Sequence, residues 1–430
     1  MLALRLGRGG HALVQVRRLL VAAASAGVGF LLLCTLGWAV DHPAGSAVRL
    51  LWSLVPVVAA AQFAAAVGRT DPGTRARSGL SAVGLGPARL SMLAATSAAV
   101  TCALGSAVAL LSFLHLRGDL AGPPFTGEGA ELLAPGRPLP LGAALMLLAV
   151  VPVLAGVTTW YAVRAASPDG AGAARSRAAA SGTAPGRASS AASTAPSTST
   201  SASASADVDE TDTERPRTAA PPPPPSAAPA APAGLPWGIA LTAAGFAIET
   251  YASRGGGTAL PLPGRFDGSP AGVLAGWSLT AVGLALAGPG LTHLCGLLLQ
   301  TVRPGAVRLL AGRMLMAEAH RIGRPLGVLC AVLSGVFAAA TLYGPGDERP
   351  FGPLTALGAT LVVGCTAATA LMAALESRQT RAALIDSLYR LGAPAAVLRT
   401  AAVVRTVALL ALFAPLTWAV AALAAVPLTR

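Results

Sequence analysis

Long apolar stretches separated by short polar segments make up most of the chain. A run of about 20 apolar residues can cross the hydrocarbon core of a bilayer as an α-helix, so this pattern predicts nine membrane spans. The spans cover residues 19–40, 47–68, 93–115, 140–163, 236–253, 271–301, 325–343, 353–375 and 400–427. The first span is longer than the core of a signal peptide, and we expect it to be retained as a helix. The predicted fold class is an all-α polytopic membrane protein.

The chain also matches itself at a fixed offset of 306 residues. Segments 74–86 and 380–392 share six of thirteen residues without a gap. The identities are Thr74/Thr380, Arg75/Arg381, Ala76/Ala382, Ser81/Ser387, Leu85/Leu391 and Gly86/Gly392. The same offset aligns the apolar runs 19–40 with 325–346, 47–68 with 353–374, and 93–115 with 399–421. The repeat predicts a duplicated helical module, with a short polar helix between two spans in each copy.

Charge patterning gives an orientation to this arrangement. The net charge of +13 comes from arginine, because the chain contains no lysine. The arginines collect before the first span, after the second, between the sixth and seventh, and after the eighth, whereas the alternate loops carry mainly Asp and Glu. The positive-inside rule then places the N-terminus and all four arginine-rich segments in the cytoplasm. Six spans, an even number, separate the equivalent polar helices of the two copies, so the copies share one orientation, and nine spans leave the C-terminus outside.

Residues 164–235 interrupt the apolar pattern. This segment is rich in Ala, Ser, Thr, Pro and Gly, includes an acidic patch at 207–214 and has five consecutive prolines at 221–225. Such a composition cannot bury enough apolar surface to offset its ordering entropy, so we expect a disordered cytoplasmic tether. The predicted units are a first module at 1–163, the linker at 164–235, a connecting hairpin of spans at 236–302, and a second module at 303–430.

Composition excludes several functional classes. With 54% hydrophobic and 11% charged residues, the chain has more apolar surface than a water-soluble core could bury. A P-loop requires a lysine to hold phosphates, and none is present. The histidines form no zinc-binding pattern, and the five cysteines lie inside apolar spans as expected of packing residues. We expect no catalytic residue, no cofactor, no metal site and no nucleic-acid partner.

Three polar residues inside the spans are candidates for a translocation path. Gln62 lies in the second span, and His293 and Gln300 lie in the sixth. Polar groups within membrane spans are functional candidates by default. The alternative is that each makes an ordinary hydrogen bond between helices.

The polar segment after the eighth span has the pattern of a short amphipathic helix. Its apolar residues fall on one face and its charged residues fall elsewhere. The apolar set is Leu384, Ile385, Leu388 and Leu391, and the charged set is Arg378, Arg381, Asp386 and Arg390. Gly392 supplies a helix C′ position and Pro394 prevents continuation. An interfacial helix with its arginines on lipid headgroups is one interpretation, but the recurrence of Leu-Gly in both copies favours docking on a partner.

The segment from Glu376 to Ala393 resembles the coupling segment of FtsX-like ABC transporter permeases. The resemblance implies two FtsX-like modules that contact a separate nucleotide-binding protein, itself a dimer. The implied coupling residues of the second copy are Glu376, Arg381, Leu384, Leu388, Arg390, Leu391 and Gly392. Those of the first copy are Arg75, Leu85 and Gly86. The first copy departs from the pattern, since Thr70 stands where Glu376 would be and Gly79 and Gly84 weaken its helix.

The expected function is therefore that of a permease subunit in the plasma membrane, driven by ATP hydrolysis in a partner chain. The resemblance implies export or extraction of a hydrophobic, lipid-like or peptide substrate. Two alternatives are a secondary transporter, which needs no ATPase, and a membrane scaffold or signalling protein regulated by one. Few ionisable groups lie within the spans, which disfavours ion coupling. The short external loops disfavour a scaffold.

The orientation yields a direct prediction. Single cysteines introduced at Gly122 and Gly268 in a cysteine-free background should react with a membrane-impermeant thiol reagent in intact cells, because both positions lie in external loops. Cysteines at Ser78 and Ser193 should react only after permeabilisation. Labelling of the Ser78→Cys protein in intact cells would show that the orientation is reversed.

Overall fold

The computed structural model describes residues 2–41, 46–70, 87–120, 133, 140–166, 234–254, 271–301, 305–342, 352–390, 392 and 394–425. Most of the segment expected to be a disordered linker lies outside these residues. The same holds for the first-copy positions Arg75, Leu85 and Gly86. Expectations for those positions remain predictions.

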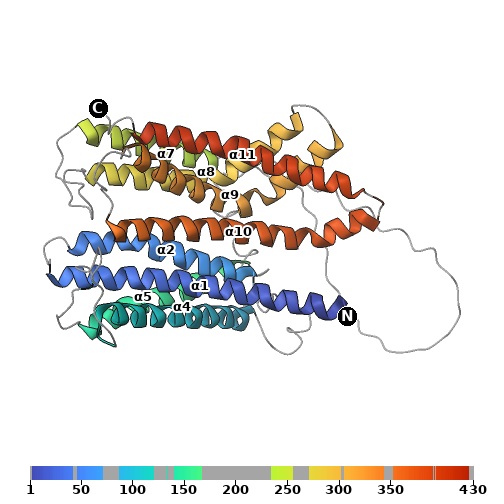
Figure 1. The fold of residues 1–430 in the computed structure, drawn as a ribbon. Helices are drawn as coiled ribbons and strands as arrows, with labels where there is room; N and C mark the ends of the chain where they lie inside the picture. The colour runs from blue at the N-terminus through green and yellow to red at the C-terminus, as the bar shows by residue number, and fades with distance from the viewer. Residues whose placement is uncertain are drawn as a thin grey trace, which may run out of the picture.

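The described elements are all α-helices, as the apolar pattern predicts (Figure 1). In chain order they are α1 (Leu2–Asp41), α2 (Ser46–Thr70), α4 (Pro87–Arg117), α5 (Leu141–Ala166), α7 (Gly234–Arg254), α8 (Ala271–Thr301), α9 (Ala306–Leu342), α10 (Pro353–Arg390) and α11 (Ala395–Ala425). No strand occurs in the described part of the chain. Helices satisfy their own backbone hydrogen bonds, which a segment in lipid must do.

Eight of these helices are long and apolar enough to cross a membrane, so the protein is a multi-pass membrane protein. The exception is α7, the fifth of the nine expected spans. It still packs antiparallel along α8: Gly238 lies against Ala287 near one end, and Ala252 lies against Gly272 near the other. A ninth span therefore remains a prediction, but α7 belongs to the helical bundle.

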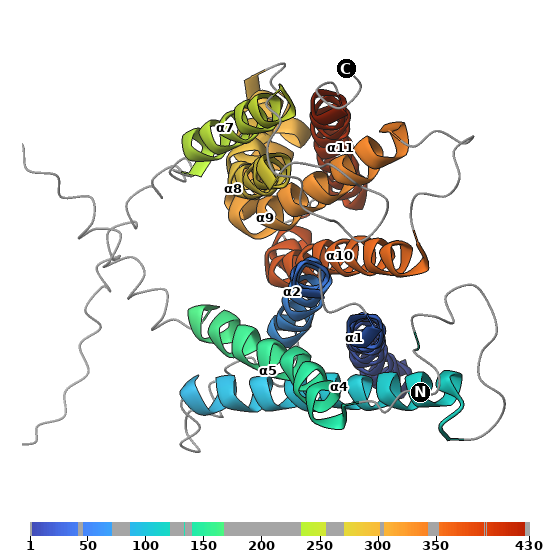
Figure 2. The ribbon, with the colours of Figure 1, turned by 90° about the vertical axis from the view of Figure 1, so that its left-hand side faces the viewer.

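The helices form two groups with α10 between them (Figures 1 and 2). One group contains α1, α2, α4 and α5, and the other contains α7, α8, α9 and α11. Helix α10 contacts α1 and α2 on one side and α9 on the other. The 306-residue offset pairs α1 with α9, α2 with α10, and α4 with α11. Within each copy the first helix contacts the second and the third, and the equivalent helices α2 and α10 contact each other.

Large apolar side chains cover the outer surface of these groups. Leu104, Met146 and Trp418 are among those with more than half of their surface exposed. Their exposure is expected where the surrounding solvent is lipid, since burial against another helix then gains little over burial against acyl chains. The interior instead contains small residues and a few tightly packed rings, such as Phe63 and Phe113.

Glycines allow α7, α8 and α9 to approach closely. A Cβ added at Gly245 would lie 2.7 Å from the carbonyl oxygen of Gly276, and one added at Gly276 would lie 2.7 Å from the carbonyl oxygen of Gly245. Gly283 makes a similar approach to the backbone of α7. Small residues at such spacing bring backbones into van der Waals contact, which is a main source of helix association in membranes. These contacts fix the position of α7 despite its lower apolarity.

This close approach predicts an asymmetric response to glycine substitution. At Gly283 a Cβ would lie 2.6 Å from the backbone nitrogen of Thr242, so Gly283→Val should force α7 and α8 apart and cost about 1–3 kcal/mol. At Gly335 nothing lies within 4 Å, so Gly335→Val should leave stability nearly unchanged. Thermal unfolding of the purified protein in detergent measures both. Equal losses in the two variants would contradict the packing.

Candidate functional site

The segment expected to form a separate amphipathic helix is the end of α10. This helix has 38 residues, or about 57 Å at 1.5 Å per residue, which exceeds the roughly 30 Å hydrocarbon core. It continues without interruption through residues 376–390, which we call the α10 extension. The helix ends at Arg390, and Gly392 has a φ of 85°. This left-handed conformation confirms the predicted C′ glycine.

Arg381 is expected on the surface of the extension, but the structure largely buries it. Its side chain is 12% exposed and faces α9, where it forms an ion pair with Glu318. Arg381 donates through Nε to Oε1 of Glu318, and its Nη2 lies against Oε2. A guanidinium that meets both oxygens of a carboxylate makes one of the stronger polar contacts in proteins. Arg381 therefore joins α10 to α9 and is not available to a partner.

A third helix contributes to this contact. Nη1 of Arg405, on α11, lies 3.7 Å from Oε2 of Glu318, and the Arg405 side chain is 14% exposed. We call Glu318, Arg381 and Arg405 the Glu318 cluster. It holds one negative and two positive charges at the end of the bundle where α1 and α9 begin and α10 ends. We call this end the arginine-rich end, and it is the end expected to face the cytoplasm.

The Glu318 cluster connects three helices, α9, α10 and α11. Helix α10 also packs against α1 and α2, so the cluster lies where one half of the protein meets the other. A displacement of the α10 extension would have to move α9 and α11 with it or break a largely buried ion pair. The single carboxylate of the cluster is already paired with two guanidinium groups, so the cluster links helices and its carboxylate is not free for binding or catalysis.

The other expected coupling residues have different environments. Glu376 is half-buried, whereas Arg390 is exposed and forms an ion pair with Asp386 at 3.0 Å. The side chains of Leu384 and Leu388 lie outside the described part of the structure, although their backbone is helical. Leu391 also lies outside the described residues. Their proposed contact with a partner remains a prediction.

The three candidate path residues do not line one common cavity. Gln62 is exposed on the outside of α2. His293 is buried on α8, and its Nε2 has no hydrogen-bond partner in the described structure. Gln300 lies further along α8, where its Nε2 is 3.7 Å from Sδ of Met316 on α9. His293 and Gln300 thus share one helix and face the interior, but Gln62 belongs to the other group and faces outward.

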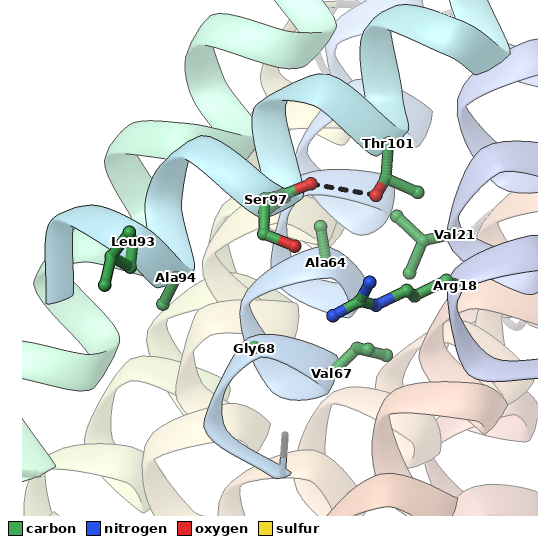
Figure 3. Close-up of a pocket in the computed structure, with 10 residues that line it drawn as sticks. Arg18, Val21, Ala64, Val67, Gly68, Leu93, Ala94, Ser97 and Thr101 are labelled. Atoms are coloured by element: carbon green, nitrogen blue, oxygen red, sulfur yellow. Dashed lines mark hydrogen bonds between the residues drawn. The ribbon is translucent and has the colours of Figure 1, made fainter. Parts of the chain in front are cut away.

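A pocket of about 200 Å³ lies between α1, α2 and α4 near the arginine-rich end. Figure 3 shows Arg18 reaching from α1 into this pocket, with Ala64 and Gly68 of α2 on one side and Ser97 of α4 on the other. Thr101 also belongs to the polar side of the pocket, and it donates a hydrogen bond of 2.8 Å to the carbonyl oxygen of Ser97. A guanidinium and hydroxyl groups beside apolar walls suit the phosphate headgroup of a lipid.

The described residues contain no cluster that could hold a metal ion. All five cysteines are buried free thiols, which agrees with their expected packing role.

Sequence reasoning missed three of these features. Glu318 has a detectable signal, since it is the only acidic residue among the arginines between the sixth and seventh expected spans. The pocket at Arg18 has no such signal, because its residues come from three helices. The third feature is a hydrogen bond from Nε1 of Trp277 to Oε1 of Glu249, 2.6 Å long, between α8 and α7.

Comparison of the chain with protein-family models, with curated proteins and with solved structures finds no match. The resemblance to FtsX-like permeases therefore depends on the residues of the α10 extension and their repeat.

The Glu318 cluster predicts a large difference between two acidic residues. Glu318→Ala leaves two mostly buried guanidinium groups unpaired and should cost about 3–5 kcal/mol. Asp386→Ala breaks only the exposed pair with Arg390 and should cost no more than about 0.5 kcal/mol. Thermal unfolding in detergent compares the two, and a loss in Glu318→Ala as small as that in Asp386→Ala would contradict the proposed link.

Proposed function

We propose that this chain is the membrane-spanning permease subunit of an ATP-driven transporter of the ABC type. On this proposal it consists of two FtsX-like modules, and a separate nucleotide-binding protein docks at the arginine-rich end. ATP hydrolysis in that protein drives export or extraction of a hydrophobic, lipid-like or peptide substrate from the plasma membrane.

The observation that carries the proposal is the α10 extension. It continues the helix about 15 residues beyond the apolar run 353–375, which at 1.5 Å per residue is about 22 Å. This length takes the helix out of the hydrocarbon core at the end expected to be cytoplasmic. A soluble partner could bind there, and the Glu318 cluster would transmit a displacement of the extension to α9 and α11.

The arrangement of helices supports the two-module part of the proposal. The contacts of α1 with α2 and α4 are repeated by α9 with α10 and α11. The equivalent helices α2 and α10 lie next to each other at the middle of the protein. Two modules that meet through equivalent helices would present two coupling segments at the same end, as a dimeric ATPase requires.

One observation favours a second candidate, a secondary transporter. Glu249 is fully buried within the second group of helices, where the sequence suggested few ionisable groups. Transport by the purified chain in liposomes without any ATPase would support this candidate. Transport that requires both the ATPase and ATP would support the first.

The proposal predicts that the apolar face of the α10 extension provides the affinity for the ATPase. A buried Leu contributes about 1.5–3 kcal/mol, whereas an exposed ion pair contributes about 0–1 kcal/mol. Leu388→Asp should therefore abolish both co-purification of the ATPase and substrate-stimulated ATP turnover. Arg390→Ala, which removes a side chain that is 81% exposed, should weaken both less than Leu388→Asp does.

The amount of each variant in the membrane should equal that of the parent, since neither position lies in the apolar run. Leu85→Asp in the first copy should weaken the complex less, because Gly79 and Gly84 disfavour a helix there. Full retention of ATPase binding and ATP hydrolysis in Leu388→Asp would exclude the coupling role of the extension.

A further inference from the structure

Glu249 is an acidic side chain buried in a membrane-embedded bundle, and no ion pair to it occurs among the described residues. It lies on α7 and is 0% exposed. Its Oε1 accepts the hydrogen bond from Trp277, but its Oε2 has no hydrogen-bond partner in the described structure. An ionised carboxylate left unpaired in such a place would be costly. The geometry thus favours a neutral, protonated carboxylic acid.

The close packing of α7 against α8 sets the position of the Glu249 carboxyl group. A Cβ at Gly276 would lie 2.9 Å from the backbone nitrogen of Glu249 and 3.0 Å from its Cβ. Only glycine at this position lets α8 pass so near to α7, and the next residue, Trp277, then donates directly to the carboxyl group. The hydrogen bond is thus set by the backbone approach of two helices and not by chance contact of flexible side chains.

A small pocket lies beside the carboxyl group. It has a volume of about 40 Å³ and is lined by residues of α7, α8, α9 and α11, including Thr280 and Ser334. Oγ1 of Thr280 is buried and has no hydrogen-bond partner in the described structure. A pocket that is polar on one side and larger than the roughly 30 Å³ of one water molecule can admit water. Water there could reach both Oε2 of Glu249 and the Thr280 hydroxyl.

Among the side chains that the structure describes around this pocket, none supplies another charge. Glu249 is the one acidic or basic side chain among the residues that line the pocket. On α9 the nearby titratable group is the thiol of Cys330, which accepts a 3.2 Å hydrogen bond from Thr417 of α11. On α8 the next one is His293, thirteen residues beyond Thr280 or about 20 Å along the helix. On α7 itself Tyr251 is exposed.

The pocket lies toward the end of the bundle opposite the arginine-rich end. Its lining includes Ala338 and Ala424, close to the ends of α9 and α11. The path from water to the carboxyl group is therefore short on that side, which is the side expected to face outward.

We propose that Glu249 is a proton-binding site that exchanges with water through this pocket. The ligand is a proton and not a metal cation, because one carboxylate and two hydroxyl groups provide too few oxygens for a hard cation. Proton binding keeps α7 and α8 packed at Gly245 and Gly276, and loss of the proton leaves a buried charge that favours their separation. This site is independent of ATPase docking.

The test uses dicyclohexylcarbodiimide, an apolar reagent that adds to protonated carboxylic acids and forms a stable acylurea. The purified full-length chain in detergent is treated at a series of pH values, without any ATPase, and modified residues are located by mass spectrometry. Glu318 is an internal control, because it is also buried but ionised by its pairing with Arg381 and Arg405. Glu249 should be labelled at least about tenfold more than Glu318, and its labelling should decrease as the pH rises.

Two variants sharpen the result. Glu249→Gln should lose the label at this site. Trp277→Phe keeps an aromatic ring but removes a hydrogen bond that favours the ionised form, so its labelling should persist to higher pH than in the parent. An unchanged pH profile in Trp277→Phe would contradict the geometry.

Other outcomes would overturn the proposal. Equal labelling of Glu249 and Glu318, or labelling of Glu249 only after denaturation, would show that the buried carboxyl group does not hold an exchangeable proton. Protection by sodium chloride but not by choline chloride at constant pH would show that a metal cation binds there instead.

Discussion

Lipid provides neither water for unpaired polar groups nor a hydrophobic force between helices, and this constraint explains most of the structure. Every described element is a helix, so the backbone is satisfied within each segment. Association must then come from close packing. The clearest case is the α7–α8 contact, where Gly245 and Gly276 bring two backbones together. The same contact positions Glu249 and Trp277, so the packing that holds a less apolar helix in the bundle also creates its buried acid.

The charged side chains have three kinds of environment, which differ in exposure and in the partners that they contact. Arg390 at the end of α10 is exposed and pairs with its helical neighbour Asp386. Glu318, deeper in the protein, is matched by two guanidinium groups from other helices. Glu249 is fully buried toward the opposite end of the bundle, and one of its oxygens accepts a hydrogen bond from an indole N–H. Because desolvation becomes more costly along this series, the three sites have different physical consequences. The Arg390 pair remains in contact with solvent. The Glu318 cluster links three helices, and the Glu249 site favours the neutral acid.

The sequence predicts the helices well because their signal is local. Apolar runs of sufficient length mark eight helices able to cross a membrane, and Gly392 followed by Pro394 marks the end of α10. Helix ends near charged residues have a weaker signal in the apolar pattern. Helix α9 begins at Ala306 and not near residue 325, because the Ala, Leu, Met and Arg residues between them favour a helix even though the arginines interrupt the apolar run.

The environment of Arg381 could not be predicted in the same way, because its partner is 63 residues away on another helix. Amphipathic periodicity places an arginine on the polar face of its own helix, and a polar face in a membrane protein can meet either water or another polar face. The difference matters for how force could pass through the protein. An exposed Arg381 would have been one more contact for a partner, whereas a buried Arg381 fixes the α10 extension to α9 and α11. Since α10 also packs against α1 and α2, a force applied at the extension would reach both halves of the protein through one rigid helix.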